Sequence, residues 1–255
     1  MADFQPAKKA LGQNFLHDQQ VIQRIVASLS PRPGETVIEI GPGRGALTDL
    51  LLDSGCNLHV IEFDYALADY WQSRAEQCDN LTVHQGNVLK VDLNAIASGR
   101  PIKVIGNLPY NISSQILISL LSVEGIVDSV VMLQLEMVER IVAEPNNKTY
   151  GRLSVMLQQH FYCDKIFKVP SGAFTPAPKV DSAMLRLTPK KPQDVLQDTD
   201  RFAEIVKAAF AQRRKTLRNN LKKLITAEQM QTVGINPTLR AENLSVEDFV
   251  RLSQL

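Results

Sequence analysis

Short β-branched runs alternate with amphipathic stretches over the first 190 residues of the chain. The runs predict buried strands at residues 36–41, 57–64, 81–86, 102–107 and 129–136. The stretches predict helices at residues 19–29, 45–55, 65–77 and 113–121, the first of them capped by Asp18. Because parallel strands need crossover connections, this alternation predicts an α/β sheet that is mostly parallel and covered by helices on both faces.

The pattern changes after residue 136. Two helical stretches, 137–143 and 150–160, precede two strand-like runs at 161–169 and 181–188. No helix separates these two runs, so we expect an antiparallel edge on the sheet. Segment 189–200 carries two prolines and little apolar content, which predicts a linker.

A helical stripe of apolar residues follows the linker and predicts a small, all-helical domain. The stripe consists of Phe202, Ile205, Val206, Ala209, Leu217, Leu221 and Leu224. We therefore expect a sheet domain at residues 1–190 and a helical domain at 200–255.

The charge is unevenly distributed along the chain. The composition is that of a globular protein, with 44% hydrophobic and 22% charged residues and a formal net charge of +1. Residues 201–255, however, hold ten basic against five acidic side chains. This asymmetry predicts an anionic partner for the C-terminal part.

Cysteines and histidines indicate neither disulfides nor a metal. The three cysteines form no CxxC pair, and the four histidines show no ligand spacing. The N-terminus has no apolar core of a signal peptide, and no apolar run approaches the roughly 20 residues that span a bilayer. We expect a cytoplasmic monomer without a metal or a membrane partner.

Three glycines, Gly41, Gly43 and Gly45, lie in the sequence EIGPGRG between the first predicted strand and its helix. Glycines let the backbone approach a ligand closely, and the helix N-terminus favours polar or anionic groups. Glu62 ends the second strand, where a carboxylate can accept hydrogen bonds from both ribose hydroxyls of a nucleoside. These features predict a nucleoside-bearing cofactor. The GxGxG spacing leaves a dehydrogenase open but favours S-adenosylmethionine, which has no phosphate.

The fourth strand ends in GNLPYNIS (106–113), where the cofactor is expected. The exocyclic amine of adenine is a poor nucleophile because its lone pair is delocalised, and two acceptors on its protons favour a tetrahedral nitrogen. The Asn107 side-chain oxygen and the Leu108 carbonyl can be these acceptors, and Pro109 biases Leu108 toward an extended backbone. Tyr110 can stack on an extruded base. The motif predicts methyl transfer to an exocyclic amine.

Six sequence blocks, in order, resemble the signature blocks of the ribosomal RNA adenine dimethyltransferases. They are LGQNFL (11–16), EIGPGRGALT (39–48), GNLPYNISS (106–114), YGRLSVM (150–156), FTPAPKVDSAMLRL (174–187) and QRRKTLRNNLK (212–222). The resemblance spans nearly the whole chain. Within the family, the blocks resemble most the bacterial enzymes that act on small-subunit RNA. It implies a Rossmann-like, S-adenosylmethionine-dependent fold that dimethylates N6 of two adjacent adenosines. These lie in the 3′-terminal hairpin loop of small-subunit RNA, so the implied partner is an assembling 30S particle.

The resemblance also implies roles for individual residues. Cofactor contacts fall on Asn14, Leu16, Gly41, Glu62 and Asn107. Asn87 stands where the family usually has an aspartate that accepts from the cofactor adenine, and it keeps an acceptor oxygen without the charge. Phe174 matches the family's second stacking aromatic, opposite Tyr110.

The run AQRRKTLRNNLKK (211–223) contains no acidic residue. Its basic residues are Arg213, Arg214, Lys215, Arg218, Lys222 and Lys223. We expect one helix with Arg214, Arg218 and Lys222 on one face, binding RNA phosphates. Lys8 and Lys9 would extend this track.

Two other functions stay open. A large-subunit RNA adenine methyltransferase of the macrolide-resistance type shares the cofactor fold and the 107–110 chemistry. A ribosome-assembly or transcription factor would bind without catalysis. The FTPAPKV block and the basic run favour the small-subunit family, and the intact residues 107–110 argue against loss of activity.

Overall fold

The computed structural model describes residue 8 and residues 13–196 and 199–255. The chain divides into two compact units. One comprises Met1–Val138 and Asp164–Pro189, and the other comprises Glu139–Cys163 and Lys190–Leu255. Within the described ranges, every helix is too short or too polar to cross a bilayer.

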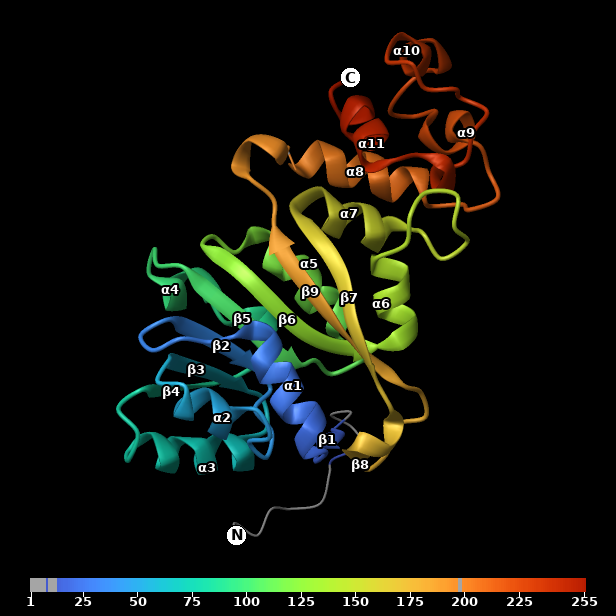
Figure 1. The fold of residues 1–255 in the computed structure, drawn as a ribbon. Coiled ribbons are helices and arrows are strands. Elements are labelled where there is room, and N and C mark those ends of the chain that lie inside the picture. Colours follow the sequence, from blue (N-terminus) through green and yellow to red (C-terminus); the bar gives the residue numbers. More distant parts are fainter. Residues whose placement is uncertain (1–7, 9–12, 197–198) are drawn as a thin grey trace. The chain divides into compact units, whose positions relative to one another are not determined.

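The first unit is built on a seven-stranded sheet with the spatial order β4-β3-β2-β5-β6-β9-β7 (Figure 1). Its strands are β2 (Thr36–Ile40), β3 (Asn57–Glu62), β4 (Leu81–Gln85), β5 (Ile102–Asn107), β6 (Ile126–Gln134), β7 (Phe161–Val169) and β9 (Ser182–Pro189). Strands β4, β3, β2, β5 and β6 pair in parallel, and β9 runs antiparallel to β6. The predicted α/β sheet, parallel for the most part with antiparallel pairing toward one edge, is confirmed.

Helices cover both faces of this sheet, with α1 crossing its front and α5 behind it in Figure 1. They are α1 (Gln19–Leu29), α2 (Thr48–Asp53), α3 (Tyr65–Ala75), α4 (Leu93–Ala97) and α5 (Ser113–Ser119). Helix α1 begins where predicted because the Asp18 carboxylate accepts hydrogen bonds from the first-turn N–H groups of Gln20 and Val21. Its buried residues Ile22 and Ile25 belong to the apolar core.

Strand β2 is buried over its whole length, as a central parallel strand covered on both faces must be. Polar ligands are therefore excluded from its faces, and only its ends are accessible. In open parallel sheets a ligand binds beyond the carboxyl ends of the strands. The sequence after β2, β3 and β5 thus lies where a site is expected.

A second sheet has two short strands, β1 (Phe15–Leu16) and β8 (Phe174–Thr175), paired antiparallel. The backbone N–H of His17 also donates to the carbonyl of Ala173, at 3.0 Å. Two-residue strands carry no periodicity, so the sequence did not predict this pairing. It fastens the segment after residue 12 to the segment before β9.

The second unit contains α7 (Arg152–His160), α8 (Thr199–Ala209), α9 (Leu217–Leu221), α10 (Ala227–Thr232) and α11 (Val246–Ser253), whereas α6 (Leu135–Ile141) crosses the unit boundary. The aromatic rings of Tyr150, Phe210 and Phe249 form its centre, with centroid distances of 6.2 and 5.7 Å. The division into units thus assigns residues 139–163, which the sequence placed in the sheet domain, to the second unit, although Phe161–Cys163 begin strand β7. The buried Tyr150 packs with the C-terminal helices, a tertiary contact that local sequence does not reveal.

The prediction of one helix over residues 211–223 is also wrong. Helix α8 ends at Ala209, and only α9 is helical in the run. The Asn220 side chain donates to the carbonyls of Ala209 and Gln212, at 2.6 and 3.1 Å, and Thr216 is extended before α9. Side-chain capture of these carbonyls replaces the helical bonds that would have continued α8.

Candidate active site

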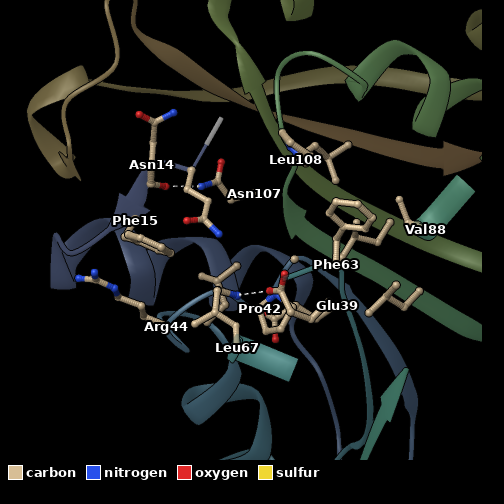
Figure 2. A pocket seen from close by; sticks show the side chains of 18 of the residues that line it. Asn14, Phe15, Glu39, Pro42, Arg44, Phe63, Leu67, Val88, Asn107 and Leu108 are labelled. Carbon is tan, nitrogen blue, oxygen red and sulfur yellow. Dashed lines mark hydrogen bonds between the residues drawn. The ribbon is translucent and has the colours of Figure 1, made fainter. Parts of the chain in front are cut away.

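A cavity of about 370 Å³ lies in the first unit, at the carboxyl ends of β2, β3 and β5. Figure 2 shows side chains from all three strand ends and from the N-terminal segment around it. The predicted residues that line it are Asn14, Leu16, Gly41, Gly43, Glu62, Asn87, Asn107, Leu108, Pro109 and Tyr110. Residues from five separate sequence segments therefore meet in one pocket.

The glycine loop between β2 and α2 forms one wall. Gly41 has φ 74°, and its N–H donates to the carbonyl of Ile61 at 2.9 Å. The indole N–H of Trp71 donates to the carbonyl of Gly43 at 2.9 Å, and a Cβ at Gly45 would lie 2.7 Å from the Trp71 ring. Only glycine fits at this point, so the loop is held tightly against α3.

Glu62 is held by the backbone on both oxygens. Its Oε2 accepts from the N–H of Gly43 at 3.1 Å, and its Oε1 accepts from the N–H of Asp64 at 2.8 Å. Burial raises the pKa of Glu62, while these backbone hydrogen bonds act in the opposite direction. The carboxylate is thus oriented before any ligand arrives, and its oxygens retain lone pairs for hydroxyl donors.

Asn87 lines the pocket and also caps a short 3₁₀ helix, Val88–Lys90. Its Oδ1 accepts from the N–H of Leu89 at 3.0 Å. The predicted acceptor oxygen therefore already has one local partner and must use its second lone pair for a ligand.

Asn107, the last residue of β5, has a defined amide orientation. Its Nδ2 donates to the backbone carbonyl of Asn14 at 3.1 Å, so Oδ1 remains as the acceptor (Figure 2). The backbone beyond it is also fixed, because the Leu108 N–H donates to the Met132 carbonyl at 3.1 Å and the Leu108 side chain is buried. Both predicted acceptors thus lie on a rigid strand end.

The Tyr110 hydroxyl has a buried hydrogen-bond partner. Its hydroxyl lies 2.7 Å from the Oγ of Ser182, which is fully buried on β9. Burial raises the pKa of Tyr110, and the Ser182 hydrogen bond acts against that rise. The phenol stays neutral, and its ring lies at the pocket wall.

Comparison with known proteins agrees with this geometry. The family profile described as ribosomal RNA adenine dimethylase matches residues 5–255. The chain belongs to this family. It is 49% identical over 252 residues to the ribosomal RNA small subunit methyltransferase A of Francisella tularensis subsp. novicida, covering 97% of this chain and 96% of the relative. It is equally identical to the protein of that name from Xanthomonas campestris pv. campestris, covering 98% and 96%.

Two solved structures share the fold over nearly the whole chain. A dimethyladenosine transferase from Plasmodium falciparum superposes with a TM-score of 0.78 at 25% identity, covering 93% of this chain and 95% of that one. The 23S rRNA methyltransferase ErmE superposes with a TM-score of 0.73 at 26% identity, covering 94% and 98%. The chain is accordingly an S-adenosylmethionine-dependent ribosomal RNA adenine methyltransferase.

The adenine dimethylase pocket fits S-adenosylmethionine. Glu62 offers an oriented carboxylate for ribose hydroxyls, and the exposed ring of Phe63 gives an apolar surface beside it. Glu39 contributes a second carboxyl group, and its buried Oε2 has no hydrogen-bond partner among the residues described. Burial raises the pKa of Glu39 to about 8, opposed by the Thr48 hydroxyl and reinforced by the charge of Glu62.

Phe63, Glu39 and Arg44 line the pocket without having been predicted. Phe63 directly follows Glu62, the last residue of β3, so its place in the sequence could have predicted that it lines the pocket. Glu39 opens the glycine motif, but its burial depends on the sheet. The Arg44 guanidinium lies 4.2 Å from the ring centroid of Phe15, a contact between segments that no local pattern reveals.

Phe174 does not belong to the pocket lining. It is 2% exposed, lies in β8 opposite Leu16 and packs in the apolar core of the first unit. Its role as a stacking aromatic stays a prediction, and in this structure the ring has a packing role.

The predicted RNA-binding residues lie in the second unit. Arg214, Lys215, Arg218, Lys222 and Lys223 are exposed. Arg213 is different, because its guanidinium pairs with Glu242 at 3.0 Å and also donates to the carbonyl of Lys148. Lys8, predicted to extend the RNA track, pairs with Asp64 at 2.8 Å, and Lys9 lies outside the described residues.

Proposed function

We propose that this chain dimethylates N6 of two adjacent adenosines near the 3′ end of small-subunit ribosomal RNA, in an assembling 30S particle. The names of its 49%-identical relatives support the small subunit. The observation that carries the chemistry is the Asn107 amide. Its Nδ2 donates to the Asn14 carbonyl, which leaves Oδ1 to accept a hydrogen bond from the adenine amine.

The cofactor would be held by Glu62 at its ribose, by the glycine loop at its amino-acid part and by Asn87 at its adenine. When bound, S-adenosylmethionine supplies an electrophilic methyl group. The residues of this chain align the acceptor nitrogen with that methyl, and such alignment supplies much of the rate of group transfer.

The target adenine would stack on Tyr110 while Asn107 Oδ1 and the Leu108 carbonyl accept from its amine. These acceptors favour a tetrahedral nitrogen with its lone pair available for attack. The nitrogen would lose one proton to water after it gains the first methyl group. One N–H then remains, so one acceptor suffices for the second transfer.

RNA affinity would come from the exposed cations of the second unit. Arg214, Lys215, Arg218, Lys222 and Lys223 can bind phosphates without reading sequence. We propose that Arg213, engaged with Glu242, contributes less than these five. A ribosomal substrate implies work in the cytoplasm, and we propose a monomer.

The direct test uses purified wild-type protein and both ribosomal subunits from cells that lack the gene. With S-adenosylmethionine, nucleoside mass spectrometry should find dimethyladenosine in small-subunit RNA alone. Asn107→Ala is the matched inactive control. Modification of large-subunit RNA would instead favour the activity in the name of ErmE, whose fold this chain shares. Particle binding without methylation would favour an assembly factor.

A further inference from the structure

Asp64 joins three parts of the first unit through one buried carboxylate. It is 4% exposed, directly follows the strand end that carries Glu62, and caps α3 by accepting from the Ala66 N–H at 3.1 Å. The same carboxylate accepts from the Lys8 ammonium at 2.8 Å and from Gln13 Nε2 at 3.0 Å. Only the hydrogen bond from the Ala66 N–H caps the helix. The hydrogen bonds from Lys8 and Gln13 instead bind the N-terminal part of the chain to Asp64.

Lys8 and Gln13 also bind each other. The Lys8 backbone N–H donates to Gln13 Oε1 at 2.8 Å. Both residues therefore reach Asp64 as one connected group, which we term the latch: Lys8, Gln13 and Asp64. Although burial acts to raise the pKa of Asp64, the hydrogen bonds from Lys8, Gln13 and Ala66 outweigh it and lower that pKa. The carboxylate consequently stays ionised at neutral pH.

The latch holds a segment that forms a wall of the pocket. Gln13, Asn14, Phe15 and Leu16 all line the cavity. The Asn14 carbonyl accepts the amide of Asn107, as Figure 2 shows, and the Phe15 ring lies 3.4 Å from where a Cβ of Gly43 would stand. Movement of this segment would open the pocket and free the Asn107 amide together.

The latch is also connected to the ribose carboxylate. The Asp64 backbone N–H donates to Glu62 Oε1 at 2.8 Å, next to the side chain that binds Lys8 and Gln13. We propose that the latch is a positioning device that keeps residues 13–16 closed over the cofactor and so sets the rate at which cofactor and product leave. Each dimethylated adenosine requires two cofactors in turn, so the pocket must open between transfers. This inference rests on the pocket being the S-adenosylmethionine site.

Asp64→Asn tests the latch with little change elsewhere. Asparagine caps helices as well as aspartate does, so α3 keeps its cap, while Lys8 loses its counter-charge. Lys8→Met breaks the same pair from the other side, where the Lys8 side chain is 42% exposed and packing loss is small. Lys168→Met is the matched control, because Lys168 pairs with Asp181 at 2.7 Å in the same unit but neither residue lines the pocket.

Release of S-adenosylhomocysteine can be followed by stopped-flow fluorescence. The sole tryptophan, Trp71, is fully buried and hydrogen-bonded to the Gly43 carbonyl, so it reports on the glycine loop. We expect Asp64→Asn and Lys8→Met each to release product about fivefold faster, as for loss of one half-exposed ion pair. The double variant should be no faster than either single variant, and Lys168→Met should match wild type.

Ionic strength separates the latch from a merely structural role. Salt screens a half-exposed ion pair, so release from wild type should accelerate between low and high salt, and release from Asp64→Asn should not. If Asp64→Asn and Lys8→Met both bind the cofactor normally and release product at the wild-type rate, the latch proposal is wrong. The proposed function would not be affected by that result. If wild type fails to bind the cofactor or its product, the pocket assignment and the latch both fall.

Discussion

The pocket and the basic run of residues 213–223 hold their polar groups in different ways. In the pocket, Glu62 has two backbone donors, Asn107 donates to a carbonyl and Tyr110 has the Ser182 hydroxyl. In the basic run all six basic side chains are exposed, and Arg213 in addition forms an ion pair with Glu242. Alignment for group transfer tolerates little displacement, so the pocket is preorganised. Phosphates need charge more than direction, so exposed cations suffice.

Asn107 should show the largest effect if the pocket acts through geometry. Asn107→Ala removes the acceptor, and we expect single-turnover methyl transfer to fall by about 100-fold or more, as when a preorganised polar group is lost. Rapid-quench assays on small-subunit particles measure it. Asn107→Asp keeps acceptor oxygens but cannot donate to the Asn14 carbonyl. Its single-turnover rate should lie between those of wild type and Asn107→Ala. A rate for the alanine variant within threefold of wild type would refute the role.

Glu62 tests cofactor binding separately from RNA binding. Glu62→Ala removes an oriented carboxylate, and loss of hydrogen bonds to a charged acceptor costs about 1.5–3 kcal/mol, or about 10- to 100-fold in affinity. Calorimetry with S-adenosylhomocysteine checks this, with Glu62→Gln as the variant that keeps one acceptor. Affinity for the ribosomal particle should not change. If Glu62→Ala binds the cofactor product as tightly as wild type, Glu62 does not bind the ribose hydroxyls.

The basic run should respond to salt and the pocket should not. Arg214→Ala with Arg218→Ala should weaken particle binding and flatten its dependence on salt by about one unit of slope per lost phosphate contact. Filter binding over a salt series gives the slope. Arg213→Ala is compared with Arg214→Ala alone, and it should change the slope less because Arg213 is paired with Glu242. Identical slopes in all proteins would mean that the run is only a solvated surface.

Tyr110 gives the smallest expected effect. Tyr110→Phe keeps the stacking ring but leaves the Ser182 hydroxyl buried without its partner, so we expect a rate loss of only about two- to fivefold, which corresponds to about 1 kcal/mol. Ser182→Ala should behave alike, and the double variant should be no worse than either. Tyr110→Ala should cost more, about 1–3 kcal/mol of base stacking. If the phenylalanine and alanine variants were equally impaired, the hydroxyl and not the ring would be the functional group.

Part of the pocket could be predicted from sequence because several of its residues mark the ends of strands, whereas Asn14, Leu16 and Asn87 came from the family resemblance. β-branched runs located β2, β3 and β5, and the residues just beyond a parallel strand must lie at one edge of the sheet. Glu62 and Asn107, each the last residue of its strand, followed directly. Phe174 did not follow, because whether an aromatic residue packs inward or lines a cavity depends on contacts that its neighbours in sequence do not encode.

Helical periodicity was reliable at one place and misleading at another. Residues 19–29 form the predicted helix because Asp18 caps it locally and its apolar face meets the sheet. Residues 211–223 have a similar period, yet the helix is broken where Asn220 binds the carbonyls of Ala209 and Gln212. A period describes what a helix would bury, and a side chain that captures backbone carbonyls can still end it.

The sequence by itself predicted the parallel sheet, the glycine loop and the residues at its strand ends, because β-branched runs and helical periodicity are local patterns. Their alternation implies parallel strands whose carboxyl ends lie at one edge. Only the tertiary structure decided the pairing of β1 with β8, the Tyr110–Ser182 contact and the Lys8–Gln13–Asp64 latch. It also joined residues 139–163 to the C-terminal helices. Such partners are far apart in the chain, and their pairing is selected by the burial of the whole core, which no local window of sequence contains.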